Sequence, residues 1–265
     1  MNYFCSEYKK GRTPNPCVFC NKYIKFGKLW DFARKNGADF FATGHYARVL
    51  THNNDVGLYE ANQAAKDQSY ALAMIDKNIL PHLILPMGQY SKQQARKLAA
   101  KLDLNIAKKK ASQEICFIPD GNWIALLENT HPELVRKGNI IDSKGNILGE
   151  HNGVHRFTIG QRRGLRVAMG TPYYVVKIDA ENNTVILGPK KELMHRKLLA
   201  TGVNWLIEKP KLAFRARVKI RYNDRGAPAT VLPQADNAVV EFDHPNCAIT
   251  PGQLAVFYIE EGINS

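Results

Sequence analysis

The spacing of hydrophobic residues changes near residue 135 of this chain. Before that point, apolar residues recur at helical spacing between Ile24 and Gly37, with Gly37 placed as the cap of a helix C-terminus. The next stretch, ADFFATGHYARV, is typical of a buried strand that enters a glycine-containing turn. Helix, strand and glycine loop in succession predict an α/β sheet, in which ligands bind at the carboxyl ends of the strands.

Two further helices are expected in this first part. Residues 66–80 have a helical pattern, and SKQQARKLAAKL begins with Ser91 and Gln94 three positions apart, which predicts a capping box. Residues 39–43 and 104–107 are expected to be strands of a parallel sheet.

After residue 135, short β-rich runs alternate with Gly- and Asn-containing turns, a pattern typical of antiparallel β-structure such as a small barrel or sandwich. The plainest strand is LAFRARVKIRY, in which apolar residues from Phe214 to Tyr222 alternate with cations. A solvated face would explain such a pattern, but four cations without acidic partners favour a surface that faces phosphates. These cations are Arg215, Arg217, Lys219 and Arg221.

The overall charge points the same way. The chain has 37 Lys and Arg against 24 Asp and Glu, a formal net charge of +13, which favours a polyanionic partner such as nucleic acid. No apolar run approaches the roughly 20 residues that cross a bilayer, and MNYFCSEYKKGRTP resembles neither a signal peptide nor a transit peptide. Five cysteines fit a reducing compartment better than a disulfide scaffold. A cytoplasmic protein without a membrane partner is predicted, and a mitochondrial location stays open as an alternative.

Three of the cysteines are candidates for chemistry. Cys17 and Cys20 lie three positions apart in GRTPNPCVFCN, and Cys116 lies far downstream in SQEICFIPDGN. A zinc site needs four ligands and no second Cys-x-x-Cys pair exists, so no metal is assigned. A nucleophile and a distant resolving thiol would suffice for persulfide or disulfide chemistry, although a lone cysteine such as Cys116 is also a common buried apolar residue. Cys5 and Cys247 are expected to be packed.

Seven stretches, in this order, closely resemble the tRNA-specific 2-thiouridylases, which install sulfur on the wobble uridine. The resemblance runs from about Tyr3 to Tyr258. The stretches are GRTPNPCVFCNKYIKF, ATGHYAR, KDQSYAL, SQEICFIPDGN, FTIGQRRGL, VKIRY and TPGQLAVFY.

The resemblance implies three domains. Residues 1–130 would be the remainder of an α/β nucleotide-binding catalytic domain of the adenine nucleotide alpha-hydrolase type, incomplete at its N-terminus. Residues 131–198 would form a small central β-rich domain, and residues 199–265 a C-terminal β-barrel.

The resemblance also implies roles for single residues. Cys116 matches the cysteine that receives sulfur as a persulfide, and Cys20 matches the partner thiol that forms a disulfide with it as the thiolated base is released. Asn15, Pro16 and Cys17 match a triplet that touches the target base, although some relatives have Asp where Cys17 stands.

Nucleotide and tRNA contacts follow in the same way. Gly44 matches an ATP-contacting glycine. Without the resemblance, His45 would be interpreted as a structural histidine and Asp67 as a helix cap. The residues that match tRNA contacts are His45, Lys66, Asp67, Gln68, Arg221, Tyr222 and Gln253.

The implied reaction is ATP-dependent. ATP with Mg²⁺ would adenylate the C2 oxygen of the uracil, and persulfide sulfur from a cysteine desulfurase or relay protein would then displace AMP, giving 2-thiouridine. The wobble base of the anticodon loop would have to be extruded to reach such a site.

One family motif, the Ser-Gly-Gly-x-Asp-Ser loop that cradles pyrophosphate, is absent from the 265 residues. An N-terminally truncated chain that is inactive alone is therefore expected. Two alternatives stay open: a tRNA-binding remnant without catalysis, and a thiolase whose iron–sulfur cluster is held by Cys17, Cys20 and Cys116.

A parallel sheet without its opening strands leaves an edge exposed and buries little apolar surface. Limited proteolysis should therefore degrade residues 1–130 well before the β-rich remainder, as followed by mass spectrometry of the fragments. Equal resistance of the two parts would contradict this expectation.

Overall fold

The computed structural model of the protein describes residues 2–53, 55–104, 115–118, 121–167 and 170–259. The chain divides into two compact units. Unit 1 comprises residues 1–16, 114–201 and 211–265, and unit 2 comprises residues 17–113 and 202–210. Among the described residues, no helix is both long and apolar enough to cross a membrane.

A continuous helical segment begins at Pro16, where proline suits the first helical position because its missing N–H would have no partner there. It consists of α2 (Pro16–Phe19), the π-helix η1 (Cys20–Leu29) and α3 (Trp30–Lys35). Gly37 follows with a φ of +84°, which confirms the predicted glycine cap. The predicted helix is therefore present, but it begins earlier than Ile24.

The parallel sheet of unit 2 is smaller than predicted. β1 (Phe41–Ala42) pairs in parallel with β4 (Leu83–Ile84), and Phe40 is 60% exposed. The expectation of a buried strand over residues 39–43 is thus wrong in both length and burial. The other expected strand, at residues 104–107, lies outside the described residues except for Leu104, which is not in a strand.

Residues 66–80 do not form the single helix that was predicted. Asp76 accepts a hydrogen bond from the Asn78 N–H and so starts a separate helical turn, and Pro81 prevents that turn from continuing as an α-helix. The helical pieces in this part of the chain are η2 (Ala64–Lys66), α4 (Ser69–Leu72) and η3 (Lys77–His82).

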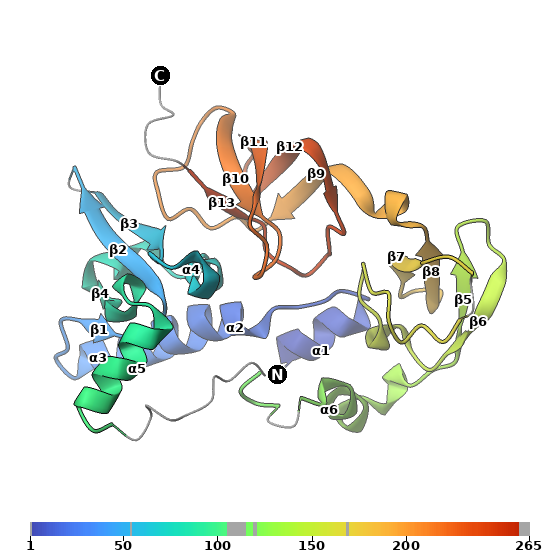
Figure 1. Cartoon of the computed structure of the whole chain (residues 1–265), viewed down its shortest axis with the longest axis horizontal. Helices are drawn as coiled ribbons and strands as arrows, with labels where there is room; N and C mark the ends of the chain where they lie inside the picture. The colour runs from blue at the N-terminus through green and yellow to red at the C-terminus, as the bar shows by residue number, and fades with distance from the viewer. Residues whose placement is uncertain (1, 54, 105–114, 119–120, 168–169, 260–265) are drawn as a thin grey trace. The chain divides into compact units, whose positions relative to one another are not determined.

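Helix α5 (Lys92–Lys101) has the predicted capping box. Ser91 Oγ accepts the Gln94 N–H at 3.1 Å, and Gln94 Oε1 accepts the Ser91 N–H at 2.7 Å. The turn η4 (Pro86–Gln89) precedes α5. The antiparallel hairpin of β2 (Ala47–His52) and β3 (Asp55–Glu60) completes this part of the unit (Figure 1).

Unit 2 has its own hydrophobic core. The helical segment from Pro16 contributes Phe26, and the hairpin contributes Ala47. The rest of this core comes from the chain between α4 and η4: Leu72, Ile75, Ile79, Leu80, Leu83 and Leu85.

Unit 1 contains a helical part and two sheets. Helix α1 (Asn2–Lys9) packs on α6 (Trp123–Thr130), where the Tyr8 and Trp123 rings stack with centroids 4.6 Å apart. Short 3₁₀ turns η6 (Pro132–Leu134), η7 (Val154–Arg156) and η8 (Lys190–Leu193) connect the other elements. The central sheet has the order β6-β5-β8-β7. Its strands are β5 (Gly138–Asp142), β6 (Ile147–His151), β7 (Tyr174–Asp179) and β8 (Thr184–Gly188).

The C-terminal sheet is antiparallel, with the order β13-β10-β11-β12-β9 (Figure 1). Strand β10 stops at Lys219 because Asp224 accepts the Ile220 N–H and turns the chain. Tyr222, predicted as a core position of this strand, is instead 41% exposed. The strands are β9 (Met194–Thr201), β10 (Phe214–Lys219), β11 (Ala227–Pro233), β12 (Asn237–Cys247) and β13 (Val256–Tyr258).

Substitution of two glycines of unit 2 by alanine is expected to have different effects on stability. A Cβ at Gly88 would overlap the backbone oxygen of Ala47, whereas a Cβ at Gly44 would meet nothing within 4 Å. Gly88→Ala should lower the stability of unit 2 by about 1–3 kcal/mol, because the backbone of η4 or β2 must move. Gly44→Ala, the matched control, should leave stability unchanged. Thermal unfolding of both variants checks this, and equal melting temperatures would contradict it.

Candidate functional site

The candidate thiols lie in different local settings. Cys17 is exposed in α2, and Cys20 is half-buried at the first position of the π-helix. Cys116 is exposed, just after the stretch 105–114 that lies outside the described residues. None of the five cysteines is in a disulfide, and Cys5 is buried as expected. Cys116 is therefore not the buried apolar residue that was considered as an alternative.

The π-helix that starts at Cys20 is anchored by a buried amide. Asn21 Nδ2 donates to the Ala71 backbone oxygen at 2.9 Å, and the Asn21 side chain is almost fully buried. Ala71 belongs to α4, whose last carbonyl oxygens have no partner within the helix. Asn204, from the segment 202–210, donates to the next free carbonyls, those of Ala73 and Ile75. Two asparagine amides thus cap α4, and that of Asn21 also joins the cysteine-bearing helix to it.

The loop after β1 also contacts the cysteine-bearing helix. His45 Nε2 lies 3.5 Å from Lys25 Nζ, and His45 Nδ1 lies 2.9 Å from Thr43 Oγ1. Burial, with a smaller contribution from the Lys25 charge, lowers the pKa of His45 to about 4. His45 is therefore neutral at pH 7, so any contact that it makes with RNA is a hydrogen bond and not an ion pair.

The KDQ stretch, Lys66–Gln68, is hydrogen-bonded to the loop that follows β1. Gln68 Oε1 accepts the Tyr46 N–H at 2.9 Å, and the Gln68 N–H donates to the Tyr46 oxygen at 2.7 Å. Asp67 is only 7% exposed, and its carboxylate accepts hydrogen bonds from Ala61 and Ser69. Asp67 thus stabilises the turn before α4, much as the capping alternative predicts, whereas Lys66 is exposed.

These contacts bring three separate motifs together within unit 2: the cysteine-bearing helix, the Gly44 loop and the KDQ stretch. Gly44 follows the carboxyl end of β1, the edge at which α/β sheets bind ligands. It is exposed, and its φ lies outside the left-handed region. The local backbone therefore does not require glycine at this position.

A second cluster of motifs meets at Thr13 in unit 1. The Gln253 side chain donates to the Thr13 oxygen at 2.7 Å, and Thr13 Oγ1 bonds to Thr158 Oγ1 at 3.2 Å. The Thr13 N–H donates to the Pro251 oxygen at 3.0 Å. Hydrogen bonds of Thr13 therefore connect the stretch GRTPNP to both FTIGQ and TPGQ. Asn15 and Pro16 lie two and three positions after Thr13 and are half-buried.

The basic strand is less free than predicted. Arg215 is paired with Asp243 through two hydrogen bonds, so the prediction that these cations lack acidic partners is wrong. Lys219 is only 6% exposed and lies over the Tyr258 ring, as does Arg217. Arg221 donates to the Ala248 oxygen at 3.0 Å. Much of this face serves to stabilise the sheet.

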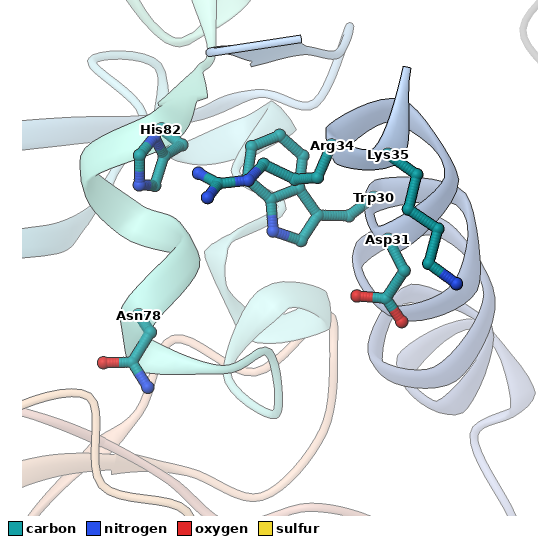
Figure 2. Close-up of a pocket in the computed structure, with 6 residues that line it drawn as sticks. All are labelled: Trp30, Asp31, Arg34, Lys35, Asn78 and His82. Atoms are coloured by element: carbon teal, nitrogen blue, oxygen red, sulfur yellow. The ribbon is translucent and has the colours of Figure 1, made fainter. Parts of the chain in front are cut away.

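One pocket of 540 Å³ lies elsewhere in unit 2 (Figure 2). The Trp30 ring lies close to both Arg34 of α3 and His82 of η3, and Asn78 lines the pocket from the start of η3. His82 Nδ1 lies 2.9 Å from the Asp39 oxygen. Asp39 and His82 precede β1 and β4, so this pocket is at the amino ends of the parallel strands, opposite to Gly44. Its position disfavours it as the nucleotide site.

Within the described part of the chain, no group of three or more His, Cys, Asp or Glu side chains could hold a metal ion. Three residues that organise the site were not identified from the sequence. Asn21 and Lys25 lie within the recognised stretch GRTPNPCVFCNKYIKF, but a polar residue on a helix carries no signal of the contacts that it makes in the fold. Thr13 could only have been found from contacts between distant segments.

Family models match almost the entire chain. Residues 1–120 match a tRNA methyl transferase HUP domain, residues 126–189 a tRNA methyl transferase PRC-barrel domain, and residues 195–263 an aminomethyltransferase beta-barrel domain. This confirms the predicted order of an α/β nucleotide-binding part, a small central domain and a C-terminal β-rich domain. The boundaries at residues 130 and 198 stay predictions.

Similar proteins include tRNA-specific 2-thiouridylases MnmA from three bacteria. The protein of Syntrophotalea carbinolica is 44% identical over 261 residues, which cover 98% of this chain and 74% of the relative. That of Acetivibrio thermocellus is 43% identical, with coverages of 97% and 73%. That of Carboxydothermus hydrogenoformans is 45% identical, with coverages of 97% and 72%. With such identity over nearly its whole length, the chain belongs to the tRNA-specific 2-thiouridylase family.

Proposed function

We propose that this protein takes part in the 2-thiolation of wobble uridine in tRNA. The observation that carries the proposal is the identity of 43–45% to 2-thiouridylases over nearly the whole chain. The half-buried Cys20 and the exposed Cys116 add the thiols that sulfur transfer needs. The family models are described as methyl transferase domains, so methyl transfer to tRNA is the competing activity.

In the proposed reaction, Cys116 carries the sulfur. A sulfur-donor protein, a cysteine desulfurase or its relay partner, converts the Cys116 thiol to a persulfide, and exposure of Cys116 suits this exchange. The terminal persulfide sulfur attacks the activated C2 of uridine. The Cys20 thiolate then attacks the Cys116 sulfur, which releases the thiolated base and leaves a Cys20–Cys116 disulfide.

Activation of C2 is assigned to ATP with Mg²⁺, which supplies the adenylate that makes the C2 oxygen a leaving group. The open backbone at Gly44 fits a ligand that approaches the main chain closely. No Ser-Gly-Gly-x-Asp-Ser stretch, the type of loop that cradles pyrophosphate, occurs in the 265 residues. We propose that the chain by itself does not adenylate tRNA.

Contacts to tRNA are divided between the two units. In unit 2, exposed Lys66 can meet a phosphate, and neutral His45 can exchange hydrogen bonds. The buried Asp67 and the bonded Gln68 act mainly by shaping the loop. In unit 1, exposed Tyr222 offers a ring for stacking beside Arg221.

Asn15 directly precedes the cysteine-bearing helix, and Pro16 and Cys17 lie within its first turn. We assign the contact with the extruded uracil to this triplet. Gln253 supports it indirectly, through its hydrogen bond to Thr13.

The proposed contact of Gly44 with ATP can be tested by substitution. Gly44→Ala should weaken ATP binding by about ten-fold or more, because the added methyl group occupies space that the ligand needs. Isothermal titration with ATP and Mg²⁺ measures this in the chain fused behind a relative's segment that carries Ser-Gly-Gly-x-Asp-Ser. Gly149→Ala is the matched control, since its Cβ would meet only Val167 Cγ1 at 3.4 Å. Unchanged affinity in Gly44→Ala would remove Gly44 from the ATP site.

The proposed sulfur transfer can be tested with the two candidate thiols. With tRNA, ATP, Mg²⁺ and a sulfur donor, the chain alone should form no 2-thiouridine, whereas the same fusion should form it. Cys20→Ser and Cys116→Ser should each abolish the product, because each removes a required thiol. Cys247→Ser, which changes a thiol without an assigned role, should retain it. Nucleoside mass spectrometry detects the product.

Three outcomes would count against the proposal. Methylated uridine in place of 2-thiouridine would favour methyl transfer. Thiolation that survives both cysteine substitutions would remove the persulfide route. Activity that depends on a chromophore absorbing visible light after anaerobic purification would favour the iron–sulfur alternative.

A further inference from the structure

Helix α5 has basic residues along one face, and none of them has a role in the proposed reaction. Its ten residues, KQQARKLAAK, contain four cations and no acidic residue. At 100° per residue, Lys92, Arg96, Lys97 and Lys101 occupy one half of the helix. The opposite half carries alanines and leucines: Ala95, Leu98 and Ala99, followed by Leu102.

This basic face has a local cost. Lys92 and Arg96, and likewise Lys97 and Lys101, are like-charged pairs at i and i+4, which destabilise a helix. Lys92 also lies at the positive end of the helix dipole, where acidic residues are favourable. The capping box of Ser91 and Gln94 offsets part of this cost. A helix selected only for solubility would mix both signs, so the pattern is better explained by an anionic partner.

The lysines of this face are available for such a partner. No residue of α5 is buried, and Arg96, Lys97 and Lys101 are exposed while Lys92 is half-buried. In the part of the chain that the structure describes, Lys92, Lys97 and Lys101 form no ion pair. This differs from the basic strand β10, in which Arg215 is paired with Asp243 and Lys219 is buried.

The turn that leads into α5 packs next to the candidate site. The turn η4, which ends two residues before Ser91, packs on β2, and the Gly88 oxygen accepts the Asn62 N–H at 2.9 Å. Strand β2 begins directly after the loop of Gly44 and His45. Helix α5 therefore follows a turn that packs on the strand next to that loop, and both belong to unit 2 (Figure 1).

We propose that the basic face of α5 binds the phosphate backbone of the RNA substrate. Four cations along one face of a helix can neutralise several consecutive phosphates without reading sequence, which suits orientation of a substrate and not its discrimination. The inference rests on the proposed function, because it takes tRNA as the polyanion. An acidic protein surface is the competing partner.

The test is the salt dependence of tRNA binding. Lys92→Gln, Lys97→Gln and Lys101→Gln together should weaken binding at least about ten-fold at ~0.1 M salt. They should also reduce the slope of log affinity against log salt by about two, because fewer counterions are released. Fluorescence anisotropy with a labelled tRNA that has a wobble uridine measures both quantities.

Two controls isolate the effect. Lys144→Gln, Lys190→Gln and Lys191→Gln remove the same charge from exposed positions of unit 1 and should keep the wild-type slope. Replacing the three α5 lysines with arginine should keep both slope and affinity. Circular dichroism checks that the glutamine variant stays folded, which is expected because Gln and Lys have similar helix propensities.

An unchanged slope in the glutamine variant, with normal binding by the wild type, would overturn the role of α5 and leave the proposed function intact. Equal losses in the unit 1 control would also overturn it, since net charge alone would then explain the effect. If the wild-type protein binds no tRNA at all, both the inference and the proposed function fail.

Discussion

A buried hydrogen bond, from Asn21 Nδ2 to the Ala71 backbone oxygen, joins the cysteine-bearing helix to α4, and Phe26 of the same helix packs in the core of unit 2. Both groups are withdrawn from water, so loss of the amide would leave a buried carbonyl unsatisfied at a cost of about 1–3 kcal/mol. Because Asn21 follows Cys20 directly, the same bond sets where the Cys20 thiol lies relative to α4. The KDQ stretch and the His45 loop are then aligned through Gln68 and Tyr46.

The π-helical geometry extends this constraint along the chain. In a π-helix each turn closes from residue i to residue i+5, so Cys20 and Lys25 lie one turn apart. Lys25 contacts His45, which places the loop after β1 beside the helix that carries Cys20. A Cβ at Gly27 would lie 2.9 Å from the Lys22 oxygen, so the wide turn tolerates only glycine without adjustment. The local backbone and the candidate chemistry therefore depend on the same few contacts.

Local signals predicted the local structure well. The capping box of α5, the glycine cap at Gly37 and the β-rich second half all follow from short-range pattern. The errors came where tertiary contacts decide the outcome. Residues 66–80 are helical by pattern, yet the Asp76 cap starts a separate helical turn and so divides them. The cations of β10 looked unpaired because Asp243, which binds Arg215, is 28 residues away.

In the candidate site too, residues within distinctive motifs could be found from the sequence, whereas residues that act through distant contacts could not. Cys20, Cys116 and Gly44 became candidates because the motifs around them resemble those of the 2-thiouridylase family. Asn21, Lys25 and Thr13 were missed, since their importance lies in contacts with residues distant in sequence. The basic face of α5 was also readable in the sequence. Only the structure shows that no residue of α5 is buried and that its lysines form no ion pair with the described residues.

The central claim is that Cys116 carries sulfur to the substrate. Incubation of the chain with a cysteine desulfurase and free cysteine, followed by alkylation and peptide mass spectrometry, tests this without ATP or tRNA. The account predicts an increment of one sulfur atom on the peptide that contains Cys116, and none on the peptides that contain Cys5 and Cys247. Sulfur distributed equally over all cysteines, or absent from Cys116, would contradict it.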